Sequence, residues 1–122
     1  MSEIADQVKE IVEGADVALF MKGTPEMAMC GNSQRALEAL RQVGAPVVAV
    51  NVLPDPRIRQ ELSQISGWPT IPQIFVKGEL VGGADITEEL AGSGELEQLL
   101  RDKLGEDYAA ERDEQTVAVF AF

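Results

Sequence analysis

Residues 17–52 read VALFMKGTPEMAMCGNSQRALEALRQVGAPVVAVNV. This stretch decides the fold, because it begins and ends with short apolar runs, residues 17–21 and 47–52, of the kind that forms buried strands. Between the runs, apolar residues recur at steps of three and four over residues 33–43, and Gly44 follows, which predicts a helix. A strand, a helix and a strand in this order predict a parallel βαβ unit with a right-handed connection.

The sequence on both sides of this unit adds helices and a hairpin. Apolar residues recur at helical spacing in four further segments, so helices are predicted at residues 3–13, 55–65, 85–91 and 94–104. Two short strands are predicted at residues 73–76 and 79–81, and the Lys77-Gly78 pair between them favours a tight antiparallel hairpin. The resulting order, αβαβαββαα, predicts an α/β fold with a four-stranded mixed sheet flanked by about five helices.

One domain accounts for most of the chain. With 122 residues, the chain is long enough to bury a sizeable core and too short for two typical domains. Residues 1–104 contain all the predicted elements and are expected to form this domain. From Gly105 the sequence becomes acidic, and it ends in an apolar segment, residues 116–122. We expect residues 105–122 to form a flexible acidic tail, with the alternative that its apolar end docks on a neighbour.

The charge balance and the lack of histidine exclude several classes of function. The chain has 10 Lys and Arg residues against 21 Asp and Glu residues, a formal net charge of −11, so we expect no binding to a nucleic-acid backbone. Because the sequence contains no histidine, catalysis by a Ser-His or Cys-His pair and zinc binding through imidazole are excluded.

No segment of the sequence indicates export or a membrane location. The apolar runs are far shorter than the roughly 20 residues needed to cross a bilayer, so we expect no membrane span. The first ten residues, MSEIADQVKE, lack the basic start and the apolar stretch of a secretory signal. We therefore expect the protein to be cytoplasmic.

Cys30 is the only cysteine, so the chain cannot form an internal disulfide or a metal site from several thiolates of its own. It lies after the first strand and just before the helix of the βαβ unit, where α/β sheets commonly place their chemistry. A sulfur at a helix N-terminus faces unpaired N–H groups and the positive end of the helix dipole, and Lys22 adds a nearby positive charge. Cys30 is therefore a candidate nucleophile with a lowered pKa. The alternative is an inert, buried thiol.

Four motifs, in the order that this fold requires, carry a family resemblance. They are Met21-Lys22-Gly23-Thr24-Pro25, Cys30-Gly31-Asn32-Ser33, Trp68-Pro69-Thr70-Ile71-Pro72-Gln73 and Gly82-Gly83-Ala84-Asp85-Ile86. Together they resemble the signatures of single-domain monothiol glutaredoxins, and the resemblance covers about residues 1–104. It implies a thioredoxin-like fold. It also implies a cis peptide bond before Pro72, which would leave the backbone of Ile71 available to an extended peptide.

The charged and backbone groups near these motifs fit a small peptide with two carboxylates, an ammonium group and a thiol. The glycines before the predicted helix at residues 85–91 offer backbone amides to an anion, and Asp85 either caps that helix or accepts an ammonium group. Lys22 and Arg59 supply cations for a second carboxylate. The resemblance implies that the peptide is glutathione, and the residues expected to bind it are Lys22, Arg59, Ile71, Ala84 and Asp85.

Two functions compete for this site. In the one we favour, which the resemblance implies, the protein carries a [2Fe–2S] cluster to apo iron–sulfur acceptor proteins. Cys30 is then one of four thiolate ligands, and a homodimer with two glutathione molecules completes the set, or a small helper protein replaces one subunit. In the other, Cys30 is the catalytic nucleophile of a glutathione-dependent thiol–disulfide oxidoreductase. A ligand-sensing or adaptor role is a third possibility, and whether the protein is an enzyme stays open.

Ser33 fits the monothiol type, whereas Asn32 and Ala84 depart from the usual pattern of the family. Ser33 stands where dithiol members have a second cysteine, so no internal thiol can resolve a mixed disulfide, and we interpret Ser33 as a helix cap. Asn32 stands where the family usually has phenylalanine, which makes the cover of the sulfur smaller and more polar. Ala84 stands where members commonly have another cysteine, which excludes a disulfide between that position and Cys30.

Overall fold

The computed structural model describes residues 3–109 and 118–120 of the chain. Its elements, in chain order, are α1 (Glu3–Gly14), β1 (Val17–Met21), α2 (Gly31–Gln42), β2 (Val47–Asn51), α3 (Pro56–Ser66), β3 (Gln73–Val76), β4 (Glu79–Gly82), α4 (Ala84–Ser93), α5 (Glu95–Leu104) and β5 (Ala118–Phe120). All nine elements predicted from the sequence are present in the predicted order, and β5 is the one addition among the residues that the structure describes.

The strands form one mixed sheet with the order β4-β3-β1-β2-β5. Strand β1 pairs in parallel with β2, as the βαβ unit predicts, and β1 pairs in the antiparallel sense with β3. Strands β3 and β4 form the predicted antiparallel hairpin. Its turn places both Lys77 and Gly78 at positive φ, 49° and 85°, which suits a tight two-residue connection. The four predicted strands therefore form the α/β sheet that the sequence indicates.

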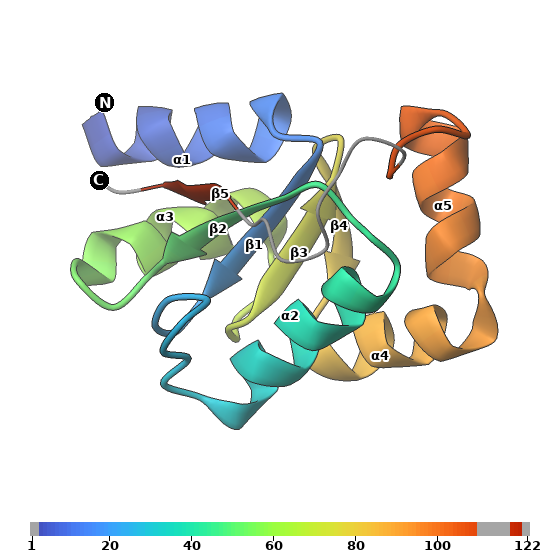
Figure 1. Cartoon of the computed structure of the whole chain (residues 1–122). Coiled ribbons are helices and arrows are strands. Elements are labelled where there is room, and N and C mark those ends of the chain that lie inside the picture. The colour runs from blue at the N-terminus through green and yellow to red at the C-terminus, as the bar shows by residue number, and fades with distance from the viewer. Residues whose placement is uncertain (1–2, 110–117, 121–122) are drawn as a thin grey trace.

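Helices cover both faces of this sheet (Figure 1). Helices α1 and α3 share a core with one face of the sheet, and α2, α4 and α5 share a core with the other. Strand β1 is central, and all five of its side chains are buried. Val17, Leu19 and Met21 belong to the core under α2, whereas Ala18 and Phe20 belong to the core under α1. This alternation explains why the first strand reads as a continuous apolar run.

The segment after α5 packs against the domain rather than leaving it at once. The hydroxyl group of Tyr108 donates a hydrogen bond of 2.6 Å to the carbonyl oxygen of Val43, at the end of α2. Burial raises the pKa of this hydroxyl. Tyr108, which lies beyond the predicted boundary at residue 104, therefore packs against the domain.

The end of the chain adds a strand that the sequence analysis does not predict. Strand β5 pairs in parallel with the edge strand β2, from Val48 opposite Ala118 to Val50 opposite Phe120. Of the expected flexible tail, residues 110–117 and 121–122 lie outside the described residues. The alternative, that the apolar end docks on a neighbour, stays a prediction, and β5 itself pairs with the sheet of the same chain.

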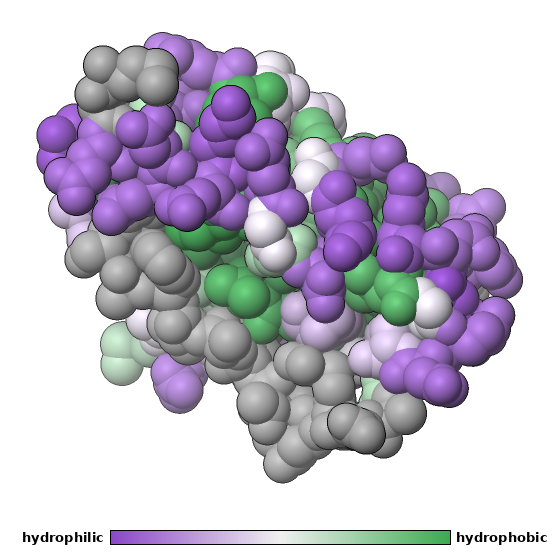
Figure 2. Space-filling view, turned by 90° about the horizontal axis from the view of Figure 1, so that it is seen from above, coloured by the Kyte–Doolittle hydropathy of each residue, from purple (hydrophilic) through white to green (hydrophobic). Residues whose placement is uncertain are grey.

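Figure 2 shows one face, on which hydrophilic residues cover most of the described surface and hydrophobic residues are visible in smaller areas between them. No described helix combines the length and the apolar character needed to span a lipid bilayer.

Replacing Tyr108 with phenylalanine tests whether the segment after α5 belongs to the folded domain. The substitution removes one hydrogen bond to Val43 and retains the ring, so the free energy of unfolding should fall by about 1 kcal/mol. Urea denaturation measures this change, and Asp107→Asn in the same turn is the control. An unchanged midpoint for Tyr108→Phe would mean that this segment contributes no stability.

Candidate functional site

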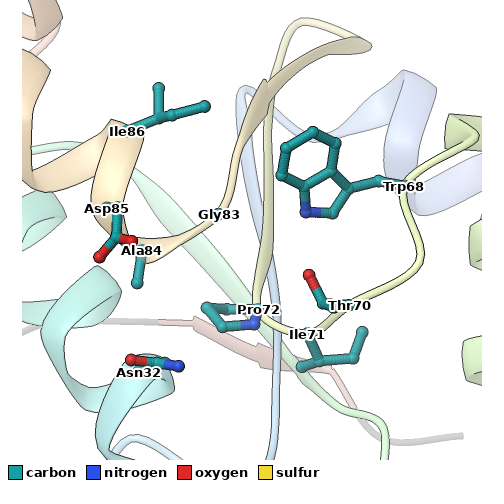
Figure 3. Close-up of a pocket in the computed structure, with 9 residues that line it drawn as sticks. All are labelled: Asn32, Trp68, Thr70, Ile71, Pro72, Gly83, Ala84, Asp85 and Ile86. Carbon is teal, nitrogen blue, oxygen red and sulfur yellow. The ribbon is translucent and has the colours of Figure 1, made fainter.

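A pocket of about 340 Å³ opens between the first turns of α2 and α4 and the segment that leads into β3. Its lining residues are Asn32, Trp68, Thr70, Ile71, Pro72, Gly83, Ala84, Asp85 and Ile86. Figure 3 shows Asn32 and Asp85 on one side of this pocket, Trp68 and Thr70 on the other, and Pro72 between them. The pocket thus brings together three of the four sequence motifs.

Cys30 occupies the N-cap position of α2, next to Asn32 at the pocket wall. It has the extended backbone of an N-cap residue, with φ −154° and ψ 129°, and its side chain is partly exposed. The interpretation of Ser33 as the helix cap is wrong, because α2 begins two residues earlier than the apolar periodicity indicates. Ser33 instead lies in the first turn and is fully buried.

The pKa of the Cys30 thiol lies below its ordinary value. The main cause is the backbone N–H of Ser33, which is directed at the sulfur, and the N–H of Asn32, the Ser33 hydroxyl and the charge of Lys22 act in the same direction. Partial burial opposes these effects. The thiol makes no full capping hydrogen bond, so the amides act on it as oriented dipoles at the helix N-terminus. Because Cys30 is partly exposed and its pKa is lowered, it is an accessible, acidified thiol rather than an inert buried one.

The loop between β1 and α2 is fixed at both ends. The buried hydroxyl oxygen of Ser33 accepts a hydrogen bond of 3.0 Å from the backbone N–H of Lys22. The backbone N–H of Met29 donates to the carbonyl oxygen of Lys22 at 2.9 Å, and the backbone N–H of Gly23 donates to the Asn51 side chain at 3.0 Å. These contacts tie the residues just before Cys30 to the end of the central strand.

The segment before β3 is held by a buried polar side chain. The Gln73 amide donates to the carbonyl oxygens of Trp68 and Thr70, at 2.8 and 3.1 Å. The Ile71–Pro72 peptide bond is cis. Within the described residues, no hydrogen bond engages the backbone of Ile71, so its N–H and C=O groups remain available to a ligand. This is the arrangement expected for a site that pairs with an extended peptide.

The N-terminus of α4 forms the opposite wall of the pocket. Gly83 is the N-cap residue, and no side chain caps this helix. The interpretation of Asp85 as the cap of α4 is therefore wrong. The Asp85 carboxylate accepts a hydrogen bond of 2.8 Å from Arg35 on α2. The amides of the first turn remain without a capping side chain, which suits a negatively charged group.

Arg35 links α2 to α4. Its guanidinium donates two hydrogen bonds to Glu88, at 2.8 and 2.9 Å, one to Asp85 at 2.8 Å, and one to the side-chain oxygen of Asn32 at 3.0 Å. The contact with Arg35 lowers the pKa of Glu88, mainly through these hydrogen bonds. Sequence analysis missed Arg35, since its partners on α4 are distant in the sequence.

The two predicted cations lie in different parts of the fold. Lys22 is partly buried at the end of β1, where its charge acts on the Cys30 thiol. Arg59 is exposed on α3 and donates a hydrogen bond of 3.3 Å to the carbonyl oxygen of Pro69, near the segment before β3. Both positions leave charge available to a ligand that extends past the pocket.

The described residues contain no complete metal site. No group of three or more His, Cys, Asp or Glu side chains within them could hold a metal ion. Because the sequence has a single cysteine, Cys30 is the one thiolate ligand that this chain can offer. A cluster with four thiolate ligands fits only if the other three come from outside the chain.

Replacing Ser33 with alanine tests the origin of the lowered Cys30 pKa. The change removes the hydroxyl near the sulfur and leaves the Lys22 N–H without its acceptor, whereas the Ser33 backbone N–H remains. The pKa of Cys30 should therefore rise part of the way to its ordinary value, and unfolding should become about 1–3 kcal/mol easier. The pH dependence of iodoacetamide alkylation measures the pKa, since the rate follows the thiolate fraction. Ser93→Ala on α4 is the control, and equal alkylation profiles would contradict the assignment.

Replacing Gly23 with alanine tests the importance of the loop geometry. Gly23 has φ +96°, and a Cβ atom there would lie 2.4 Å from the carbonyl oxygen of Met27 and 2.7 Å from the backbone nitrogen of Met29. The variant should lose about 2–4 kcal/mol of stability and show altered Cys30 alkylation. Gly14→Ala, where a Cβ meets nothing within 4 Å, should behave like the unchanged protein. Equal thermal stability of Gly23→Ala and Gly14→Ala would show that the loop geometry does not require glycine at position 23.

Comparisons with known proteins agree with this geometry. The family model described as Glutaredoxin matches residues 17–81. The chain is 52% identical over 84 residues to a probable monothiol glutaredoxin GrlA of Legionella pneumophila, covering 69% of this chain and 94% of that protein. It is 41% identical over 118 residues to the mitochondrial monothiol glutaredoxin-5 of Saccharomyces cerevisiae, covering 94% of this chain and 77% of that protein.

Solved structures of glutaredoxins share the fold. A truncated, monomeric mutant of 1-C-Grx1 from Trypanosoma brucei is 38% identical and has a TM-score of 0.75, covering 84% of this chain and 94% of that one. The reduced apo form of GrxS14 from poplar is 39% identical and has a TM-score of 0.71, covering 81% of this chain and 91% of that one. With one cysteine at the N-terminus of α2, on a thioredoxin-like fold, the chain belongs to the monothiol members of the glutaredoxin family.

Proposed function

We propose that this protein binds a [2Fe–2S] cluster together with glutathione and transfers the cluster to apo iron–sulfur proteins. The observation that carries the proposal is the single, partly exposed thiol of Cys30, which has a lowered pKa and lies beside a pocket with peptide-binding features. A thiolate is the form of cysteine that binds iron, and its exposure allows ligands from other molecules to approach the same metal.

Glutathione matches the groups around the pocket. The free backbone of Ile71 can pair with the peptide, as in an added strand. The uncapped first turn of α4, at Ala84 and Asp85, can receive one carboxylate of glutathione, and the Asp85 carboxylate can receive its ammonium group. Lys22 and Arg59 lie where they can attract the second carboxylate. Bound in this way, the peptide would hold its own sulfur next to Cys30.

Counting thiolates leads to a dimer. A [2Fe–2S] cluster has four ligands, and one chain with one glutathione molecule supplies two thiolates. Two copies of the chain with two glutathione molecules therefore complete the set, and in a mixed dimer a small helper protein replaces one copy. Half of the ligands are then diffusible, which favours release of the cluster to an acceptor protein. We expect this function to be exercised in the cytoplasm.

A glutathione-dependent oxidoreductase is the second candidate, and the accessible Cys30 thiolate also supports it. The thiolate would attack the glutathione sulfur of a protein–glutathione disulfide, so that a Cys30–glutathione disulfide forms and the protein thiolate leaves. A second glutathione thiolate would then attack the glutathione sulfur of this mixed disulfide. The products are oxidised glutathione and free Cys30, and no second cysteine is needed.

Anaerobic reconstitution with iron, sulfide and glutathione separates the two candidates. The carrier function predicts visible sulfur-to-iron charge-transfer absorption and a shift to the mass of a dimer. Both signals should be absent without glutathione and absent in Cys30→Ser, because each removes half of the thiolates. Arg59→Ala should raise the glutathione concentration needed for assembly and leave the thermal midpoint unchanged, since Arg59 is exposed.

The outcomes of this experiment are distinct. A cluster that assembles in Cys30→Ser would refute the assignment of the metal ligand. In the other outcome, the unchanged protein reduces a glutathione mixed disulfide and assembles no cluster in the presence of glutathione. This result would refute the carrier function and support the oxidoreductase function.

A further inference from the structure

Arg35 holds the side-chain amide of Asn32 in one orientation. A guanidinium group donates hydrogen bonds and accepts none, so the 3.0 Å contact with Arg35 must be made by the amide oxygen of Asn32. The amide nitrogen is then on the opposite side. Figure 3 shows this nitrogen directed toward the pocket and Pro72, and the oxygen directed away. None of the described residues accepts a hydrogen bond from this nitrogen, so its two N–H groups are free to bind a ligand.

Arg35 is itself fixed by the carboxylates of α4. Two hydrogen bonds to Glu88 and one to Asp85 use three of its donors, and the contact with Asn32 uses a fourth. A planar guanidinium in a bidentate contact has little freedom to rotate. Arg35 is therefore a rigid support for Asn32, and few of its donors remain for a ligand.

We propose that Arg35 is a positioning residue that makes Asn32 a hydrogen-bond donor to a carbonyl or carboxylate oxygen of the peptide bound in the pocket. The inference rests on the proposed binding of glutathione and adds one recognition contact to it. Asn32 both lines the pocket and lies two residues from Cys30, so the contact would fix the ligand close to its sulfur. A phenylalanine at this position could not make it, because its ring has no donor.

The charged side chains near Asn32 also affect which groups of a ligand can bind on this side of the pocket. Asp85 and Glu88 share one guanidinium, so the attraction of Asp85 for a ligand ammonium group is partly offset by Arg35. An oxygen acceptor that approaches Asn32 meets N–H groups and a nearby positive charge. The N–H groups of Asn32 therefore suit an acyl or carboxylate oxygen of the peptide, while its ammonium group can still approach the Asp85 carboxylate.

A double-mutant cycle tests the proposal, with S-methylglutathione as the ligand, because it cannot form a disulfide with Cys30. Asn32→Ala removes the donor, and we expect about tenfold weaker binding. Arg35→Lys keeps the charge but removes the fork that orients the amide, and it should weaken binding by a similar factor. The double variant should bind no more weakly than either single variant, because both changes remove the same contact. Arg101→Lys, which alters an arginine–carboxylate contact on α5, is the matched control and should bind like the unchanged protein.

A spectroscopic measurement separates positioning from general support of the fold. In the unchanged protein, the side-chain N–H resonances of Asn32 should shift on titration with S-methylglutathione. In Arg35→Lys they should shift much less, at an unchanged thermal midpoint. This inference would be wrong if Asn32→Ala bound S-methylglutathione with unaltered affinity, or if the Asn32 resonances did not shift on titration. Either result would leave the proposed function unaffected. If the unchanged protein fails to bind both glutathione and S-methylglutathione, the proposed function falls together with the inference.

Discussion

The chemistry of this protein depends on one hydrogen bond, from the backbone N–H of Lys22 to the buried hydroxyl group of Ser33. Lys22 follows the central strand β1, and Ser33 lies in the first turn of α2, so the bond fixes the start of the helix relative to the sheet. The Met29 N–H closes the intervening loop on the Lys22 carbonyl group. As a result, Cys30 is held at the helix N-terminus by atoms of the core while its sulfur still faces solvent.

The elements of the fold could be predicted because their signals are local. Strand β1 is buried on both faces, so its apolar run identifies it without any knowledge of its partners. Helix α2 has a buried stripe at helical spacing, and the strand–helix–strand order then fixes the parallel pairing of β1 with β2. The position of Cys30 between strand and helix follows from the same reasoning. Its lowered pKa follows mainly from that position and the neighbouring amides, to which the Ser33 hydroxyl and the charge of Lys22 add.

The features that sequence reasoning missed depend on contacts between distant residues. The role of Ser33 was misjudged because apolar periodicity starts later than the helix itself. In the sequence, Arg35 looks like an ordinary surface residue of an amphipathic helix, because its ion pair with Glu88 forms only when α4 packs against α2. Strand β5 was missed because three residues after an acidic segment form a strand only where the edge of β2 is available. In each case, the partner lies in a part of the chain whose approach the local pattern cannot indicate.

Asn32 connects the architecture of the site to the balance between the two candidate functions. An apolar side chain beside the sulfur would exclude water and favour a long-lived metal centre, whereas a polar one admits water and hydrogen bonds to the sulfur ligands. Arg35 directs the donor groups of Asn32 toward the pocket. In the proposed function they would bind the peptide ligand there, and they would not shield the sulfur from water. For the proposed carrier, this combination would strengthen the hold on glutathione and leave the metal exposed, which would favour transfer over storage. For an oxidoreductase, the same donors would orient the glutathione half of a mixed disulfide for attack by the Cys30 thiolate.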